Sequence, residues 1–273
     1  MYRVELLGES AWRTAHPEQQ TEANLGAAAR AYFETLGLEP SAETLLHHVV
    51  AIGHAPAYGR ENADALMQDW MRIPLAAAAD VLARSAALGG RVCNLLAGCG
   101  SAQEGRMRLG VLSIVGGEPL DASRDLAVSA RWGIAGRGGI AMPSGGRLVE
   151  RDYAADEMAT LSEGAEAAGL SLEASLGLLG ATCLDVYLND RAFWRCVPIR
   201  VWRYGLGGYS VIKKWLSYRE RALLGRDLRS DEARHVTDMA CRIAAILLLE
   251  PALDENYERV KADTYPWPAG EGA

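Results

Sequence analysis

The chain changes character close to residue 98, and this change constrains its fold more than any other feature. From about residue 20 to residue 97 the sequence has alanine-rich runs, few strand-forming residues and apolar side chains at helical spacing. Apolar residues three and four positions apart indicate one face of an amphipathic helix. We expect three or four helices there, with Ser41 as an N-cap and with breaks at residues 37–40, 53–59 and 74.

Glycine becomes frequent from Gly98 to Tyr153, where short β-branched runs stand between turn-forming residues. Such a pattern predicts loops and short strands. Beyond it we expect helices at 154–168 and 172–179, a strand at 185–188, a helix at Tyr209–Leu224, and a last helix capped by Ser230 that ends before Pro251. The sequence therefore predicts an α+β fold: a helical N-terminal region at residues 1–97, then a mixed domain at residues 98–273 with short strands, a Gly-rich loop region and C-terminal helices.

The composition is that of a folded domain rather than of a membrane or secreted protein. Its 273 residues are 49% hydrophobic, which is enough to bury one or two cores. The five cysteines are odd in number, widely spaced and form no CxxC pair, so neither a disulfide framework nor a zinc site is indicated. The longest apolar run, Ile243–Leu249, is too short to span a bilayer, and no secretory signal opens the chain. We expect a cytoplasmic protein with free thiols, no metal and no membrane contact.

One segment carries a strong positive charge in an otherwise acidic chain. The net charge of the whole chain is −7, yet residues 191–230 contain ten Lys or Arg side chains against two acids, Glu220 and Asp227. Aromatic side chains are interleaved with them. Because the local field rather than the total charge governs contact with a phosphate backbone, this segment is a candidate surface for a polyanion. A solvated helix face, with Trp202, Trp215 and most of the other rings packed in the core, is the alternative explanation.

A second cationic segment is rich in glycine. Residues 126–149 hold Arg131, Arg137 and Arg147 and no acid, with six glycines between Gly133 and Gly146. A guanidinium can donate two hydrogen bonds to a phosphate or to a guanine edge, and a glycine-rich backbone permits close approach. The spacing does not predict a dinucleotide site, because no long strand and helix flank it. An exposed surface loop is the simpler alternative.

Residues 95–101, LLAGCGS, resemble only in part the glycine turn that holds S-adenosylmethionine. Leu96 stands where such turns have an acidic side chain, Ala102 replaces the last glycine, and no NPPY or DPPY tetrapeptide occurs to receive an adenine. The three histidines between residues 47 and 54 show no convergent carboxylate or thiolate partner, and no GxSxG motif marks a nucleophile. We therefore expect no catalytic residue, cofactor or metal in this chain.

Several longer segments resemble one known family, in the same order along the chain. They are HAPAYGRENADALMQDWMRIPL (54–75), GVLSIVGGEPLD (110–121), DLAVSARWGIAGRGGIAMPSGGRLVERDY (125–153), DVYLNDRAFWRCVP (185–198), VWRYGLGGYSVIKKWLSYRERALLGR (201–226) and MACRIAAILLLEPALDENYERVKADTYPW (239–267). Together they resemble the C-terminal specificity domain of type ISP restriction-modification enzymes, the part that follows an adenine methyltransferase domain. Met71 departs from the pattern where a proline is expected, and residues 92–105 have no clear counterpart.

The resemblance implies that the chain is a non-catalytic target-recognition domain for duplex DNA, in an enzyme system that serves phage defence. Its partner would be an adenine methyltransferase that binds S-adenosylmethionine, in cis or in trans, with nuclease or translocase domains as further candidate partners. Basic side chains around α-helical residues 213–219 would contact phosphates, and arginines in variable-looking loops would contact bases. The candidate DNA-binding residues are Arg106, Arg108, Arg131, Arg137, Arg147, Arg195, Lys213, Lys214 and Arg219.

Two other functions stay open at this point. One is a freestanding S-adenosylmethionine-dependent methyltransferase built around residues 95–101. The other is a helical protein-interaction subunit whose basic strip binds an acidic partner. Cofactor titration distinguishes the first of these from a DNA-recognition domain, and competition with DNA distinguishes the second.

Overall fold

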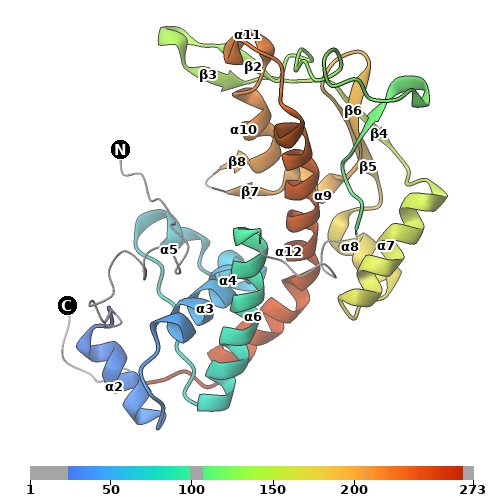
Figure 1. Ribbon diagram of the computed structural model, residues 1–273. Coiled ribbons are helices and arrows are strands. Elements are labelled where there is room, and N and C mark those ends of the chain that lie inside the picture. The colour runs from blue at the N-terminus through green and yellow to red at the C-terminus, as the bar shows by residue number, and fades with distance from the viewer. Residues whose placement is uncertain (1–23, 99–106, 207, 267–273) are drawn as a thin grey trace, which may run out of the picture.

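One long helix, α12 (Ser230–Ala262), runs through both hydrophobic cores of the protein (Figure 1). The computed structural model describes residues 24–98, 107–206 and 208–266. The N-terminal half of α12 packs with the sheet, whereas its C-terminal half packs among the helices from the start of the chain. The α+β fold is confirmed. The domain boundary near residue 97 stays a prediction. The structure adds that α12 contributes to the cores on both sides of this boundary.

Helices alone build the first core. They are α2 (Ala27–Thr35), α3 (Ala42–Gly53), α4 (Pro56–Glu61), α5 (Ala63–Gln68) and α6 (Ala79–Ala97). The helical character of this region is confirmed, although the described residues form five helices rather than three or four. As predicted, Ser41 caps α3, because its Oγ accepts a hydrogen bond from the Thr44 amide at 3.1 Å. His48 is fully buried, with ring nitrogens 2.8 Å from Ser85 Oγ and 2.9 Å from the Pro74 carbonyl oxygen, so its role is structural.

A four-stranded antiparallel sheet with the strand order β1-β6-β5-β4 forms one side of the second core. Its strands are β1 (Val111–Ile114), β4 (Leu148–Arg151), β5 (Cys183–Tyr187) and β6 (Ala192–Pro198). The predicted helices are confirmed as α7 (Ala155–Ala167) and α8 (Leu172–Leu179), and the predicted strand as β5. Alternate side chains of β5 and β6 enter the core, where Trp194 and Trp132 are completely buried.

Two small hairpins lie outside this sheet, near the short helices that follow β6. One pairs β2 (Gly133–Ala135) with β3 (Ala141–Pro143), and the other pairs β7 (Gly205–Leu206) with β8 (Tyr209–Ser210). The helices are α9 (Ile199–Arg203), α10 (Val211–Ser217) and α11 (Arg221–Leu224). The β2–β3 hairpin and α11 lie at one end of the molecule, with α10 beside them (Figure 1).

The continuous helix predicted at Tyr209–Leu224 is wrong. The chain pairs as β8, forms α10, and then breaks before α11. The break arises because the Arg221 amide donates to the carbonyl oxygen of Val128 at 2.7 Å instead of continuing the helical ladder. A contact with a segment more than ninety positions away therefore overrides local helix propensity.

The N-cap and the end predicted for the last helix are also wrong. The side chain that caps the N-terminus of α12 is that of Glu232 rather than Ser230. The Glu232 carboxylate accepts a hydrogen bond from the Arg229 amide at 2.9 Å. At the other end α12 continues through Pro251 to Ala262. An internal proline costs a helix about 3 kcal/mol, and the buried Leu249 and Leu253 on either side offset this by packing in the first core. Neither α12 nor any other helix of the described residues is long and apolar enough to cross a membrane.

Candidate nucleic-acid interface

The fold neutralises most of the cationic segment at residues 191–230. Six of its ten basic side chains form ion pairs with carboxylates, largely from other parts of the chain. The pairs are Arg191 with Glu118 and Asp125, Arg195 with Asp156 and Glu157, Arg200 with Glu250, Arg221 with Asp227, Arg226 with Glu232, and Arg229 with Asp231 and Glu232. The excess of positive charge in the sequence is therefore much smaller on the folded surface.

Four cations of this segment keep no carboxylate partner within salt-bridge distance among the described residues: Arg203, Lys213, Lys214 and Arg219. All four belong to the short stretch from α9 to Arg219, two residues after α10. This stretch is where the folded protein concentrates positive charge that a polyanion can still neutralise.

Aromatic rings, rather than acids, hold two of these four cations. The Lys214 ammonium lies 4.6 Å from the ring centre of Tyr209 and 4.9 Å from that of Tyr218. The Arg219 guanidinium stacks on Trp215, with Cζ 3.9 Å from the ring centre, and donates to the Trp215 carbonyl oxygen at 3.3 Å. A cation over an aromatic face is fixed in position but keeps its full charge. Burial lowers the pKa of Arg219, and its Nε is buried without a hydrogen-bond partner in the described structure.

The β2–β3 hairpin is anchored firmly at its base, against the end of α10. The Trp132 amide donates to Glu220 Oε2 at 2.7 Å, and the Trp132 indole donates to the Tyr187 carbonyl oxygen at 2.7 Å. Gly133 passes so close to α10 that a Cβ there would lie 2.0 Å from the carbonyl oxygen of Ser217. Only glycine permits this approach, which brings the hairpin and the cationic stretch together.

The far end of the same hairpin is exposed. Arg137 lies in its turn and is exposed, and the exposed Arg131 precedes its base with a positive φ of 64°. Ile134, Ile140 and Met142 are also exposed, at 49%, 68% and 52%. The hairpin is therefore a projection that combines large apolar side chains with guanidinium groups.

The predicted DNA-binding residues fall into separate groups in the structure. Arg131, Arg137, Lys213, Lys214 and Arg219 lie on adjacent elements, because the β2–β3 hairpin packs on α10 and α11. Arg147 lies elsewhere, paired with Asp190 at 3.1 Å and stacked 4.1 Å from the ring centre of Tyr187. Arg106 falls outside the described residues. All of these assignments stay predictions, and the first group is the one that the fold brings together.

Arg108 and Arg195 lie apart from this group, beside a cavity of about 310 Å³ at β1, β6 and α7. Arg195 lies 2.6 Å from Glu157 and 3.0 Å from Asp156, so its charge is already compensated. Arg108 is exposed at the rim. The acids in this cavity make it a less suitable surface for phosphate than the stretch around α10.

Sequence reasoning missed three apolar residues of the hairpin and one cation. Ile134 precedes the glycine-rich turn, and Ile140 and Met142 follow it at alternate positions, a pattern that predicts one face of a hairpin. Arg203 ends α9 and is exposed. The alternation was visible in the sequence, but the freedom of Arg203 from a carboxylate depends on the tertiary fold.

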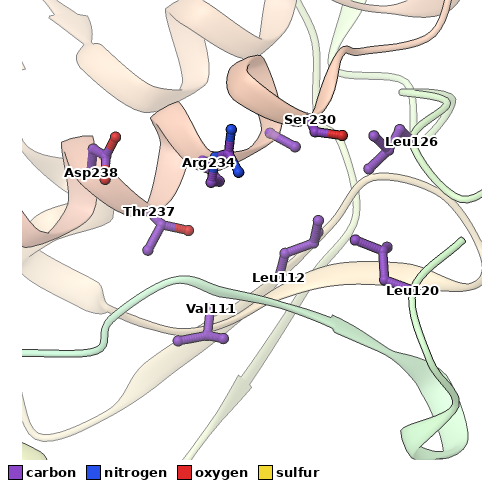
Figure 2. Close-up of a pocket in the computed structure, with 9 residues that line it drawn as sticks. Val111, Leu112, Leu120, Leu126, Ser230, Arg234, Thr237 and Asp238 are labelled. Atoms are coloured by element: carbon purple, nitrogen blue, oxygen red, sulfur yellow. The ribbon is translucent and has the colours of Figure 1, made fainter. Parts of the chain in front are cut away.

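A second, larger cavity of about 500 Å³ lies between β1 and the first turns of α12. Figure 2 shows Arg234 and Thr237 of α12 on one side, with Val111, Leu112 and Leu120 on the other. The strand side is apolar, while the α12 side carries the polar groups. The residues that line this cavity belong to neither the β2–β3 hairpin nor α10.

Three potential metal ligands, Glu157, Cys183 and Cys196, converge with their ligand atoms within 4.8 Å of one another. The Glu157 oxygens already accept hydrogen bonds from Arg151 at 2.7 and 2.8 Å and from the Ala154 amide at 2.8 Å. Burial raises the pKa of Glu157, and the Arg151 hydrogen bonds outweigh it to bring the pKa to about 2. A metal ion would have to displace these donors beside a guanidinium, so the cluster fits a buried ion pair better than a metal site.

The described part of the LLAGCGS segment is the end of a helix. Leu95, Leu96 and Ala97 form the last turn of α6, and Gly98 ends it with a left-handed conformation. The glycine turn of a dinucleotide-binding fold instead follows a strand. Residues 99–101 lie outside the described residues. The local structure therefore gives no support to a cofactor turn at this position.

Comparison with known proteins identifies one family. The model of the type ISP C-terminal specificity domain matches residues 8–106 and 178–244, which is more than half of the chain. No curated protein and no solved structure matches the chain. The match includes residues 92–105, where the sequence alone had suggested no counterpart, and leaves out residues 107–177 and 245–267, where a resemblance had been expected.

The matched residues include α9, α10 and the start of α12, while the β2–β3 hairpin lies in the part that the family model leaves out. The match confirms the resemblance stated from the sequence segments. Specificity domains of this kind serve DNA target recognition in restriction-modification enzymes, and a purely recognising domain needs no catalytic residues of its own. Because this match covers more than half of its residues, the chain belongs to the family of type ISP C-terminal specificity domains.

Proposed function

We propose that this chain recognises a specific sequence of duplex DNA on behalf of an adenine methyltransferase of the type ISP class. One observation carries the proposal: the cations of residues 203–219 that pair with no carboxylate of the described residues lie beside a projecting hairpin with Arg131 and Arg137. Phosphate contacts position a protein on DNA, and contacts with base edges specify the sequence. The two neighbouring elements offer side chains suited to each of these tasks.

Phosphate contact is assigned to Lys213, Lys214 and Arg203. An ammonium group held by aromatic rings, as in Lys214, can approach a phosphate without first breaking an ion pair. The paired arginines of the same segment would have to give up a carboxylate, which lowers the gain from a phosphate. The DNA surface is therefore smaller than the run of ten basic residues in the sequence.

Base contact is assigned to the hairpin, with Arg137 at its turn. A guanidinium can donate two hydrogen bonds to O6 and N7 of guanine in the major groove. The family model covers α10 but not the hairpin. This division supports a shared phosphate-binding surface and a base-reading element that is particular to this chain.

The chemistry of methylation is assigned to a partner rather than to this chain. We propose that S-adenosylmethionine binds in an adenine methyltransferase, attached or separate, with nuclease or translocase domains as further partners in a cytoplasmic phage-defence system. Residues 95–98 support this assignment because they end a helix instead of forming the strand and turn of a cofactor site.

Salt dependence of DNA binding tests the proposal. The affinity for duplex DNA should fall with a log–log slope of about 0.9 per phosphate contact. The double variant Lys213→Ala and Lys214→Ala should flatten this slope by up to about two contacts. The matched control, Arg84→Ala with Arg259→Ala, removes the same charge from exposed positions on α6 and the far end of α12.

An unchanged slope and affinity in the lysine variant would exclude α10 as the phosphate-binding surface. Equal flattening in the control would show that only total charge matters. If an acidic protein binds the chain and duplex DNA does not compete with it, the chain is instead a protein-interaction subunit.

A further inference from the structure

The β2–β3 hairpin has two unlike faces. Its register places Ile134 directly opposite Met142, so both side chains point to the same side of the ribbon. Ile140 stands two positions before Met142, just ahead of β3, so its side chain points to the same side of the ribbon. It is the most exposed of the three side chains, at 68%. The other face carries only small side chains, Gly133, Ala135, Ala141 and Pro143.

The small-residue face packs on the body of the protein at its Gly133 end, while Ala135 and Pro143 are exposed. Gly133 lies against the carbonyl oxygen of Ser217 and close to the Leu223 side chain, and both strands contact α10. The larger side chains must therefore lie on the opposite face. Met142 extends over Gly136, where a Cβ would lie 2.8 Å from its sulfur, so the apolar face continues toward the turn of the hairpin.

Three exposed apolar side chains on this short hairpin need an apolar partner, because water is a poor solvent for them. The charges around them limit the choice. Arg131 and Arg137 flank the hairpin, no acid occurs between residues 126 and 149, and Lys213 and Lys214 lie on the adjoining helix. An apolar patch on a segment that carries arginines and no acid fits a polyanion that also presents methyl groups.

The major groove of DNA is such a surface. It admits a two-stranded β-ribbon, and each thymine presents its C5-methyl group there between two phosphate backbones. We infer that the outer face of the β2–β3 hairpin enters the major groove and reads thymine methyl groups through Ile134, Ile140 and Met142, with Arg137 at its tip. This inference rests on the proposed function and adds the chemistry that selects the base pairs.

The anchored base makes the hairpin suitable for this role. Glu220 and Tyr187 both accept hydrogen bonds from Trp132, so the base of the ribbon is fixed before DNA binds. An ordered reading element loses little conformational entropy on binding. Tyr209 and Leu206, exposed on the second hairpin, lie nearer to α9 and α10 and are not needed for the contact.

The experiment selects preferred duplexes and then removes single methyl groups. The full chain is incubated with a random-sequence duplex library, the bound fraction is sequenced over several rounds, and affinities are measured for the enriched duplex. Each thymine of the enriched duplex is then replaced by deoxyuridine, which removes only the C5-methyl group. Burial of one methyl-sized group is worth about 0.8 kcal/mol, so each contacted thymine should lose about fourfold in affinity.

Two variants complete the design. The triple variant Ile134→Ala, Ile140→Ala and Met142→Ala removes the large apolar side chains of the outer face, and Leu46→Ala with Met67→Ala removes exposed apolar area from α3 and α5. The hairpin variant should no longer distinguish thymine from deoxyuridine, whereas the control variant should keep the fourfold loss. The affected side chains are exposed, so both variants should fold, which circular dichroism verifies. The deoxyuridine series on the unaltered chain needs no variant at all.

The outcomes separate this inference from the function on which it rests. If the hairpin variant selects the same sequence and keeps the same response to deoxyuridine, the inference is overturned while DNA recognition stands. A wild-type chain that is indifferent to every methyl group also overturns it, because a contact in the minor groove cannot sense that methyl. If the chain shows no salt-dependent duplex binding, the proposed function fails, and the inference fails with it.

Discussion

The carboxylate of Glu220 accepts a hydrogen bond from the backbone amide of Trp132 at 2.7 Å, and this bond ties the end of α10 to the base of the β2–β3 hairpin. Both residues are buried, so neither group can exchange this partner for water. An element assigned to phosphate contact is thereby held in register with an element assigned to base contact. This carboxylate acts together with the close approach of Gly133 to Ser217 in fixing the relative position of the two.

Replacing Glu220 should test this coupling directly. Glu220→Ala leaves the buried Trp132 amide without its acceptor, which costs about 1–3 kcal/mol in the free energy of unfolding. Glu220→Gln keeps an oxygen acceptor and should lose less. Urea denaturation measures both. We expect Glu220→Ala also to weaken sequence discrimination more than salt-dependent affinity, and equal discrimination in all three proteins would show that the hairpin does not depend on this bond.

The division between base and phosphate contacts predicts different effects for two cations. In the complete methyltransferase, Arg137→Ala should relax the choice at one base pair, because loss of a two-bond contact to guanine costs about 1–3 kcal/mol of discrimination. Lys214→Ala should instead weaken methylation of all sites nearly equally. Genome-wide mapping of methylated adenines compares the variants. An unaltered recognition sequence in the Arg137 variant removes that side chain from base contact.

The proposed assignment of the methyl donor to a partner predicts a simple binding result. The isolated chain should show no saturable binding of S-adenosylmethionine at micromolar concentrations and no methyl transfer to DNA. Isothermal titration calorimetry measures the first and radiolabelled methyl transfer the second. Saturable binding by the chain alone would support a freestanding methyltransferase.

His48 should make the fold less stable as the pH falls. Burial lowers the pKa of His48, and the hydrogen bond to Pro74 only partly opposes this. Near pH 6.5 the unfolded chain therefore binds a proton at His48 that the folded chain does not bind. The free energy of unfolding decreases below that pH by at most about 1.4 kcal/mol per pH unit. His235, whose pKa burial also lowers, adds in the same direction.

Urea denaturation between about pH 7 and pH 5 measures this effect. In the unfolded chain the pKa values of the carboxyl groups are about 4.5 or lower, so these groups titrate mainly below that window. Glu157 and Glu232, with pKa values of about 2 in the fold, begin to lose their contribution only below it. The pH dependence should be smaller in His48→Gln. An identical slope in that variant would assign the whole effect to other groups.

Pro251 offers a stabilising substitution. It lies exposed inside α12, where it removes one amide donor from the helical ladder. Pro251→Ala should raise the free energy of unfolding by about 2 kcal/mol. Alanine stabilises a helix interior by about 3 kcal/mol relative to proline, and the greater conformational freedom of the unfolded chain without proline reduces this gain. Thermal and urea denaturation check this value. Ala252→Gly, at the next exposed position of the same helix, is a control that should destabilise by about 1 kcal/mol.

The sequence by itself determined the class of fold and several of its elements. The apolar spacing and glycine content predicted the helices α7 and α8, the strand β5 and the cap at Ser41, because each depends on interactions between residues close in the chain. The family also followed from continuous segments. The charge of residues 191–230 and the arginines of the glycine-rich run directed attention to the two elements that the fold places side by side.

Only the tertiary structure decided which of those charges remain available. Arg191 meets Glu118, and Arg200 meets Glu250, across separations in sequence that no local pattern encodes. The same is true of the break between α10 and α11, which the Val128 carbonyl oxygen imposes, and of α12, which continues past Pro251 because a distant core buries its flanks. Charge and helix propensity belong to single residues, whereas pairing and burial are properties of contacts, and these contacts form only when the chain is folded.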